Sequence, residues 1–283
     1  MPNAILLVSC PDKKGITAAV TNFVYQNNGN IEHADQHIDQ QTNTFFMRIE
    51  WVLDAFKIDR DRIAAHFQPI ADKFHMDLNL YFNDCPARMA IFVSKYPHCL
   101  YDLLLRQRSG QLMCEIPLIV SNHPDAKDIA RSFKIDYFEF PVLKENKAEQ
   151  ERRQLELLRT AGIEFIVLAR YGQILTRDFV SAFQNKIINI HHSFLPAFVG
   201  KDPYGQAYQK GVKIIGATSH YVTPELDAGP IIEQDTARVN HRDSLRDLSI
   251  KGEDLERIVL SRAVRRHLER KILVYNNKTV IFD

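Results

Sequence analysis

The chain has 283 residues, a formal net charge of +1, and a composition that is 45% hydrophobic and 25% charged. At roughly 150 residues per domain, this length predicts about two domains, each large enough to bury a core. A near-neutral chain has no field to attract nucleic acid or anionic lipid, and no apolar run approaches the roughly 20 residues of a membrane span. We therefore expect a cytoplasmic protein that binds neither nucleic acid nor membranes.

The first 83 residues predict a compact ferredoxin-like domain with the element order βαββαβ. Its strands are short apolar or alternating segments, and its helices carry apolar residues at helical spacing. Asp12 is the expected N-cap of the first helix. The predicted strands are residues 5–8, 30–39, 44–51 and 76–82, and the predicted helices follow Asp12 and cover about residues 59–67.

From residue 84 onward, apolar strands alternate with helices, a pattern that predicts a mostly parallel, Rossmann-like sheet covered on both faces. Ligands in such sheets bind at the carboxyl ends of the strands, near a switch in strand order. Strands are expected at residues 89–93, 118–121, 165–168, 187–190 and 214–221, helices at 98–108, 126–134, 147–161 and about 252–270, and a final hairpin at 272–275 and 279–282.

The four cysteines are widely spaced, and none belongs to a Cys-x-x-Cys pair. That pair is the usual mark of a zinc or redox site, so we expect no metal. Without an export signal, the thiols are expected to stay free in a reducing compartment. The cysteines are Cys10, Cys85, Cys99 and Cys114.

Asn189 and His191 stand two positions apart at the end of an apolar strand. Residues two apart in a strand project to the same side, so both side chains can converge on one point beyond the strand end. An amide donor beside an imidazole suits a developing oxyanion, and His191 can also transfer a proton. The alternative is that His191 and His192 cap the strand by bonding to backbone groups.

Asp227 lies in the loop after the strand at residues 214–221, next to Ala228, Gly229 and Pro230. If this loop comes near His191, the carboxylate can keep the imidazole protonated and steer or activate water. The alternative is that Asp227 caps the loop by accepting hydrogen bonds from backbone N–H groups.

Together these segments resemble the 10-formyltetrahydrofolate-dependent formyltransferase family, over about residues 88–283. The resemblance implies that Asn189, His191 and Asp227 are catalytic and that Thr218 and His220 support them. It also implies the formyltransferase fold. The matching positions are Asn189, His191, Ser193, Leu195 and Pro196, then Gly216, Ala217, Thr218 and His220, then Leu226, Asp227 and residues 229–232.

The same resemblance implies two loops that hold the pterin of the folate. The residues concerned are Arg170, Tyr171, Gly172, Gln173, Ile174 and Leu175 in one loop, and Pro224, Glu225 and Leu226 in the other. An alternative for Arg170 and Tyr171 is packing at a strand end. No cofactor is implied, because 10-formyltetrahydrofolate is itself the substrate.

Within this family, the segment at residues 93–100 favours the formyltetrahydrofolate deformylases. Relatives that formylate a ribonucleotide amine hold its phosphate on a glycine-rich turn after the first strand of the domain. Here that segment has no glycine, and Pro97 removes a backbone donor. Residues 94–95, 102–104 and 119–125 instead resemble the deformylases.

The first domain resembles an ACT regulatory module, which the deformylases carry, through its element order and through Cys10, Pro11, Asp12, Gly15 and Ile16. Such modules hold a small effector, often an amino acid, between paired modules. The resemblance therefore implies effector contacts at Asp12, Gly15 and Ile16 and a homo-dimer or homo-tetramer. The alternative is that Asp12 and Gly15 only form the start of a helix.

The expected function is hydrolysis of 10-formyltetrahydrofolate to tetrahydrofolate and formate, which balances one-carbon folate pools and supplies formate for purine biosynthesis. The expected domains are an ACT-type regulatory domain at residues 1–83 and a catalytic domain at residues 84–283. One rival is transfer of the formyl group to an amine acceptor. A second rival is a folate-binding or amino-acid-binding regulator with a relic active site.

Overall fold

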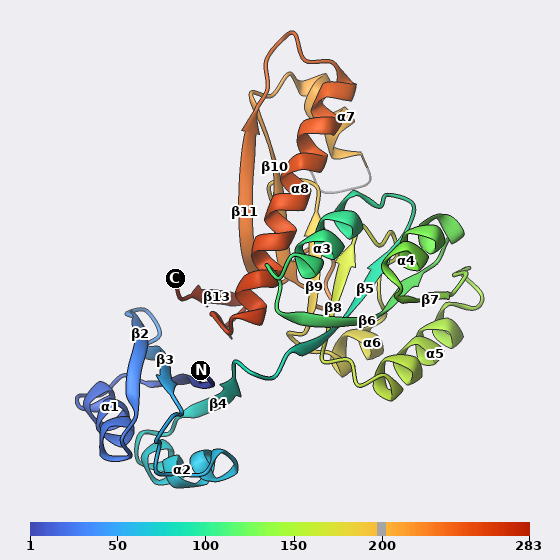
Figure 1. Ribbon diagram of the computed structural model, residues 1–283. Coiled ribbons are helices and arrows are strands. Elements are labelled where there is room, and N and C mark those ends of the chain that lie inside the picture. The colour runs from blue at the N-terminus through green and yellow to red at the C-terminus, as the bar shows by residue number, and fades with distance from the viewer. Residues whose placement is uncertain (197–201) are drawn as a thin grey trace. The chain divides into compact units, whose positions relative to one another are not determined.

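The computed structural model describes residues 1–196 and 202–283 (Figure 1). By its internal contacts the chain forms two compact units. The first unit comprises residues 1–86, 269–275 and 280–283, and the second comprises residues 87–268 and 276–279. The division into functional domains at residues 1–83 and 84–283 remains a prediction, and the contact units differ from it by placing residues 269–275 and 280–283 with the first unit.

The first unit has the predicted βαββαβ order around an antiparallel sheet with strand order β2-β3-β1-β4. Apolar side chains of α1 and α2 pack on one face of this sheet, around Trp51 and Phe67. The elements are β1 (Asn3–Pro11), α1 (Ile16–Gln26), β2 (Asn30–Asp39), β3 (Thr44–Val52), the 3₁₀ turn η1 (Arg60–Arg62), α2 (Ile63–Phe74) and β4 (Asp77–Phe82).

Two local expectations for this unit were wrong. Asp12 does not cap α1, and its backbone N–H instead donates to the carbonyl of Asn43. The helix begins at Ile16, and its N-cap is Gly15, whose backbone lies in the left-handed region with φ 92°. Glycine adopts this conformation at little cost. The second helix also continues beyond the predicted end at residue 67 to Phe74, because burial of its apolar face outweighs the donor that an internal proline removes.

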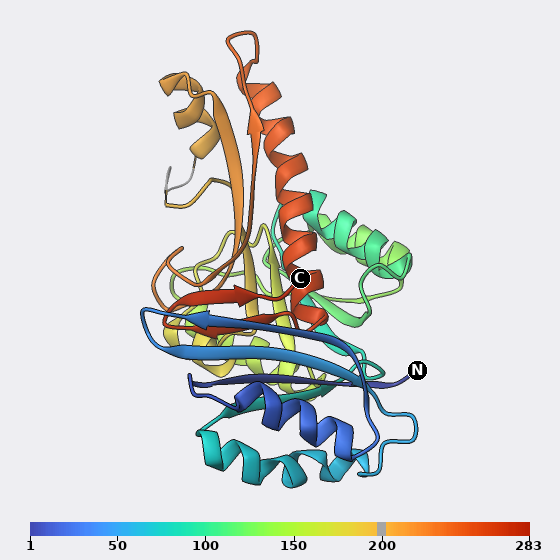
Figure 2. The same cartoon turned by 90° about the vertical axis from the view of Figure 1, so that its left-hand side faces the viewer.

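The other face of the sheet is covered by the C-terminal hairpin, β12 (Ile272–Tyr275) and β13 (Lys278–Ile281) (Figure 2). Apolar side chains of the hairpin, together with Phe282 directly after β13, form a cluster with Leu7 and Phe46 of the sheet. Arg48 donates to the backbone carbonyls of residues 269 and 270. The turn at residues 276 and 277 has positive φ at both asparagines, as the sequence predicts for a tight hairpin.

The second unit contains a seven-stranded sheet with strand order β11-β10-β9-β8-β5-β6-β7. Strands β5 to β9 are parallel, which confirms the mostly parallel formyltransferase-type sheet. The elements are β5 (Ala87–Val93), α3 (His98–Arg108), β6 (Cys114–Ser121), the 3₁₀ turn η2 (Pro124–Ala126), α4 (Lys127–Phe133), β7 (Asp136–Glu139), α5 (Lys147–Thr160), β8 (Phe165–Ala169), α6 (Arg177–Ala182), β9 (Ile187–His191), α7 (Pro203–Lys210), β10 (Ile214–Tyr221), β11 (Ile231–Arg238) and α8 (Leu245–Leu268).

The strand at residues 214–221, expected among the parallel strands, instead runs antiparallel to β9. In this register Thr218 lies opposite His191, and His220 lies opposite Asn189. The antiparallel pairing therefore brings two polar residues of β10 beside the end of β9. The long helix α8 lies along β10 and β11 (Figure 1).

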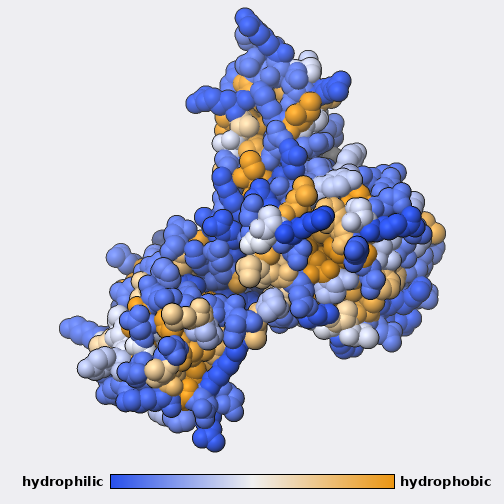
Figure 3. All heavy atoms as spheres, in the orientation of Figure 1, coloured by the Kyte–Doolittle hydropathy of each residue, from blue (hydrophilic) through white to orange (hydrophobic). Residues whose placement is uncertain are grey.

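The order of the parallel strands reverses between β5 and β8, because β6 and β7 extend from β5 in one direction while β9 extends from β8 in the other. The connections that leave these strands separate at this point and open a crevice at their carboxyl ends. Among the described residues, no helix is long and apolar enough to cross a membrane. The face shown in Figure 3 is mainly hydrophilic, with hydrophobic patches interrupted by polar side chains.

Candidate active site

A cavity of about 540 Å³ lies at the carboxyl ends of β5, β6, β8 and β9, within the usual size range of small-molecule sites. It collects the predicted catalytic residues Asn189, His191 and Asp227 in one place. It also collects His220 and all nine residues of the two predicted pterin loops. The remaining lining residues are Ser94, Lys95, Tyr96, Asn122, His123, Leu168, Ile190, His192, Val222 and Thr223.

His191 and Asp227 form the central pair of the cavity. The imidazole Nδ1 lies 3.3 Å from Oδ2 of the carboxylate, and the two side chains are only 6% and 13% exposed. The other ring nitrogen, Nε2, is buried and has no hydrogen-bond partner among the described residues. The carboxylate therefore holds the Nδ1 edge of the imidazole, whereas Nε2 is available to a ligand.

Asp227 is held as a carboxylate by its neighbours. Its hydrogen bond with His191, followed by that with His220, outweighs burial and lowers the pKa of Asp227 far below the ordinary 3.8. Its negative charge therefore lies 3.3 Å from Nδ1 of the His191 imidazole. The predicted proximity of Asp227 and His191 is thus what the fold produces.

His220 orients the amide of Asn189. Its Nδ1 lies 2.9 Å from the carbonyl oxygen of Tyr221, so this nitrogen carries a proton and donates it. Nε2 of the same ring faces both Nδ2 of Asn189, at 3.3 Å, and Oδ1 of Asp227, at 3.7 Å. Asn189 also lines the cavity, so its amide can contact a ligand there.

Thr218 supports the site from beneath and does not line the cavity. It is fully buried on β10, and its hydroxyl donates to the carbonyl of Ser193 at 2.9 Å. The same oxygen accepts from the backbone N–H of Leu195 at 3.0 Å and from the Gln234 amide at 2.9 Å. These bonds hold the segment that follows His191.

The loop after β8 is held by two residues that the sequence did not single out as site residues. The backbone N–H of Gly172 donates to Oγ of Ser94 at 2.9 Å, and the Ser94 hydroxyl donates to Oδ1 of Asn122 at 2.5 Å. These residues lie after β8, β5 and β6, far apart in sequence. Only their places after neighbouring strands could have signalled that they meet.

The predicted effector residues lie together at the turn between β1 and α1, in the first unit. Asp12 is partly exposed and Gly15 is exposed. Ile16 is only 1% exposed and belongs to the core under the sheet. A ligand at this turn would therefore meet Asp12 and the backbone at Gly15, while the Ile16 side chain packs inward.

Comparison with family models matches residues 87–264 to the formyl transferase family and residues 4–68 to the ACT domain. The chain is 56% identical over 279 residues to formyltetrahydrofolate deformylase of Synechocystis, with 99% of this chain and 98% of the relative covered. It is 48% identical to the Bacillus subtilis formyltetrahydrofolate deformylase, with 98% and 93% covered.

Solved structures give the same relationships. A formyltetrahydrofolate deformylase from Pseudomonas syringae superposes with a TM-score of 0.98 at 44% identity, covering 100% of this chain and 95% of that one. A glycinamide ribonucleotide transformylase from Symbiobacterium toebii superposes with a TM-score of 0.66 at 28% identity, covering 72% of this chain and 98% of the other. The transformylase thus shares a large part of the fold, whereas the deformylase matches the full length.

Proposed function

The chain belongs to the formyltetrahydrofolate deformylase family, and from this premise we propose that it is a hydrolase that converts 10-formyltetrahydrofolate and water into tetrahydrofolate and formate. The observation that carries the proposal is the convergence of Asn189, His191 and Asp227 in one cavity, with Nε2 of His191 available to a ligand. Such an arrangement suits addition of water to an amide carbon.

The reaction forms one bond and breaks one. Water adds to the formyl carbon, and the carbonyl oxygen becomes an oxyanion. Protonated His191, through Nε2–H, and the amide N–H of Asn189 stabilise that charge. Collapse of the intermediate then breaks the bond between the formyl carbon and N10. N10 accepts the proton that the attacking water gave to Asp227, and formic acid leaves and ionises to formate.

Asp227 serves this sequence in two ways. Its carboxylate faces Nδ1 of His191 at 3.3 Å, which directs Nε2 toward the oxyanion and places a negative charge beside the ring that donates to it. It also accepts a proton from the attacking water, directly or through a second water. Every proton transfer in this scheme uses side chains of the chain itself, and we propose that no cofactor or metal takes part.

Direct measurement of formate tests the proposal. Purified protein incubated with 10-formyltetrahydrofolate and no amine should release formate over many turnovers. Asp227→Asn should reduce turnover by at least about a hundredfold, because the amide carries no charge beside His191 and cannot accept a proton from water. Asp235→Asn, which removes an exposed partner of Arg262 on β11, is the matched control and should keep the parent rate.

Retention of the parent rate by a folded Asp227→Asn protein would refute the assigned mechanism. Formyl transfer to an added amine, with no formate in its absence, would favour the transferase alternative. Tight folate binding with neither activity would favour the regulator.

We further propose that the enzyme works in the cytoplasm, where it balances one-carbon folate pools and supplies formate for purine biosynthesis. The ACT domain supports regulation by a small ligand, for which we propose an amino acid at the turn that contains Asp12 and Gly15. We also propose a homo-dimer or homo-tetramer, which light scattering would test.

A further inference from the structure

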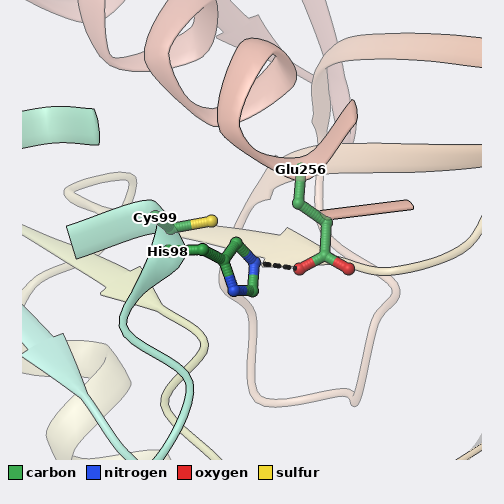
Figure 4. Close-up of side chains that lie close together, drawn as sticks. All are labelled: His98, Cys99 and Glu256. Carbon is green, nitrogen blue, oxygen red and sulfur yellow. Dashed lines mark hydrogen bonds and ion pairs between the residues drawn. The ribbon is translucent and has the colours of Figure 1, made fainter. Parts of the chain in front are cut away.

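Glu256 is a carboxylate of α8 with no exposed surface, in a place where side chains from several elements meet. Oε2 accepts a hydrogen bond from Nε2 of His98 at 2.8 Å, and Oε1 accepts one from the hydroxyl of Tyr204 at 2.6 Å. Nε of Arg170 lies 3.2 Å from Oε2, an ion pair without hydrogen-bond alignment. Figure 4 shows the carboxylate of Glu256 facing the imidazole of His98.

The partners of Glu256 keep it charged despite its burial. Burial alone would raise its pKa, but the hydrogen bond from His98, the charge of Arg170 and the hydrogen bond from Tyr204 together lower the pKa below its ordinary value. A buried charge is tolerated when it is paired and hydrogen-bonded. Glu256 therefore acts as a fixed negative charge around which these side chains are arranged.

Three residues of metal-binding type also meet here, since ligand atoms of His98, Cys99 and Glu256 all lie within 4.8 Å of one another (Figure 4). Two features oppose a metal. The guanidinium of Arg170 already neutralises the carboxylate and would repel a second cation. Burial, followed by the charge of Glu256, raises the pKa of the Cys99 thiol well above its ordinary value, which disfavours the thiolate that binds metals.

Gly252 shows how closely α8 is fitted to this cluster. It lies one helical turn before Glu256, and a Cβ at this position would come within 2.1 Å of the ring of Tyr204. Glycine is disfavoured in helix interiors. Here its missing side chain leaves room for the Tyr204 ring to cross α8 and reach the carboxylate of Glu256.

Arg170 connects this cluster to the cavity. It follows β8 with a φ of 63°, and it lines the cavity together with Tyr96, whose ring centroid lies 5.4 Å from the guanidinium carbon. A long cationic side chain would otherwise sample many rotamers and extend toward solvent. The charge of Glu256 and the Tyr96 ring restrict it to the wall of the cavity.

We propose that Glu256 is a positioning residue for folate binding, because it fixes Arg170 at the cavity wall before the ligand arrives. A preformed wall lowers the entropic cost of binding. The proposal rests on the proposed function in one respect, namely that this cavity binds folate. Of these two residues, only Arg170 lines the cavity and contacts the ligand, and Glu256 acts through Arg170.

Equilibrium binding of tetrahydrofolate, the reaction product, tests this without requiring turnover. Glu256→Gln should raise the Kd for tetrahydrofolate, and the KM for 10-formyltetrahydrofolate, by about tenfold while kcat stays within about threefold. Arg170→Met should weaken binding by a similar factor. If Glu256 acts through Arg170, adding Glu256→Gln to Arg170→Met should raise Kd by no more than about twofold.

The matched control is Asp254→Asn, which removes an exposed carboxylate of the same helix that pairs with Arg257, and it should leave Kd unchanged. Additive effects in the double variant, or an unchanged Kd in folded Glu256→Gln protein, would overturn the proposal.

If Glu256→Gln does not fold, Gly252→Ala provides a second test, because it displaces the Tyr204 ring and keeps the charge of Glu256. This variant should raise the Kd for tetrahydrofolate by a smaller factor, and an unchanged Kd would again overturn the proposal. If the wild-type protein binds tetrahydrofolate but releases no formate, the result would count against the proposed function and not against the role of Glu256.

Discussion

The backbone of Asp227 lies in the left-handed region, with φ 53°, where aspartate is one of the few residues other than glycine that is tolerated. This conformation lets its two carboxylate oxygens face two rings, with Oδ2 3.3 Å from His191 and Oδ1 3.7 Å from His220. Asp227 therefore contributes to the stability of the loop as well as to the proposed chemistry.

That contribution depends on pH in a defined direction. The pKa of Asp227 in the folded chain lies below its ordinary 3.8, chiefly through the hydrogen bond with His191 and then that with His220. Its ionised form therefore stabilises the fold above pH 3.8, and the contribution is lost as pH falls toward the folded pKa. At pH 7, Asp227→Asn should lower the free energy of unfolding of the second unit by about 2 kcal/mol.

Urea unfolding of both proteins between pH 7 and pH 3 measures this dependence. The difference between wild type and Asp227→Asn at pH 5 should narrow as pH falls below about pH 4. A difference that stays constant down to pH 3, or that grows as pH falls, would contradict the assigned pairing. Asp235→Asn serves again as the control for loss of an exposed carboxylate.

At the scale of elements, the loop between β10 and β11 is fitted tightly to the end of β10. A Cβ on Gly229 would lie 1.7 Å from the carbonyl oxygen of Tyr221, which is backbone and has little freedom to move away. Gly229→Ala should therefore displace the loop that carries Asp227 and reduce turnover by at least about tenfold, since small displacements of reacting groups are costly.

Gly110→Ala is a suitable comparison for that variant. Gly110 has a positive φ of 77° with open space around it, so alanine there is strained but meets no neighbouring atom. It should lower stability modestly, by about 1 kcal/mol, and leave turnover unchanged. Steady-state formate release and thermal unfolding of both variants separate the two effects; equal turnover in both would show that the loop position does not matter.

Sequence periodicity predicted the elements that carry strong local patterns. The βαββαβ order, the parallel strands through β9 and the convergence of Asn189 with His191 follow from spacing within single segments. The helices α6 and α7 and the strands β7 and β11 were not predicted. The first three are short, and β11 has a single fully buried residue, so none shows a strong apolar repeat.

The direction of β10 and the supporting contacts of the site could not be read from local patterns. Direction depends on how the chain returns after β9, and Ser94, Asn122 and Glu256 act through partners that are distant in sequence. The resemblance to a family identified the proposed catalytic positions, because its motifs lie at the end of β9 and in the loop after β10. The resemblance did not identify Glu256, which lies in the middle of a helix, where a charged residue ordinarily faces solvent.

At the scale of the whole chain, the last residues return to complete the unit that contains the first. Neighbouring residues of β3 place apolar side chains on both faces of the sheet of the first unit. Met47 packs in the core with α1 and α2, and Phe46 packs against the C-terminal hairpin. A sheet with two apolar faces needs cover on both. The helices α1 and α2 cover one face, and β12 and β13 cover the other.

Phe282 tests this role because its side chain is only 1% exposed and packs in the cluster with Leu7 and Phe46. Phe282→Ala removes a large buried ring and should destabilise the first unit by about 3–5 kcal/mol. Hydrogen exchange measured by mass spectrometry should show faster exchange in β1 and β3, with little change in β5 and β8. The matched control is Tyr25→Ala, which removes an aromatic ring that is 78% exposed on α1 and should leave exchange unchanged. Equal protection of β1 in wild type and Phe282→Ala would mean that the hairpin adds little to the unit, and that its apolar face is satisfied in some other way.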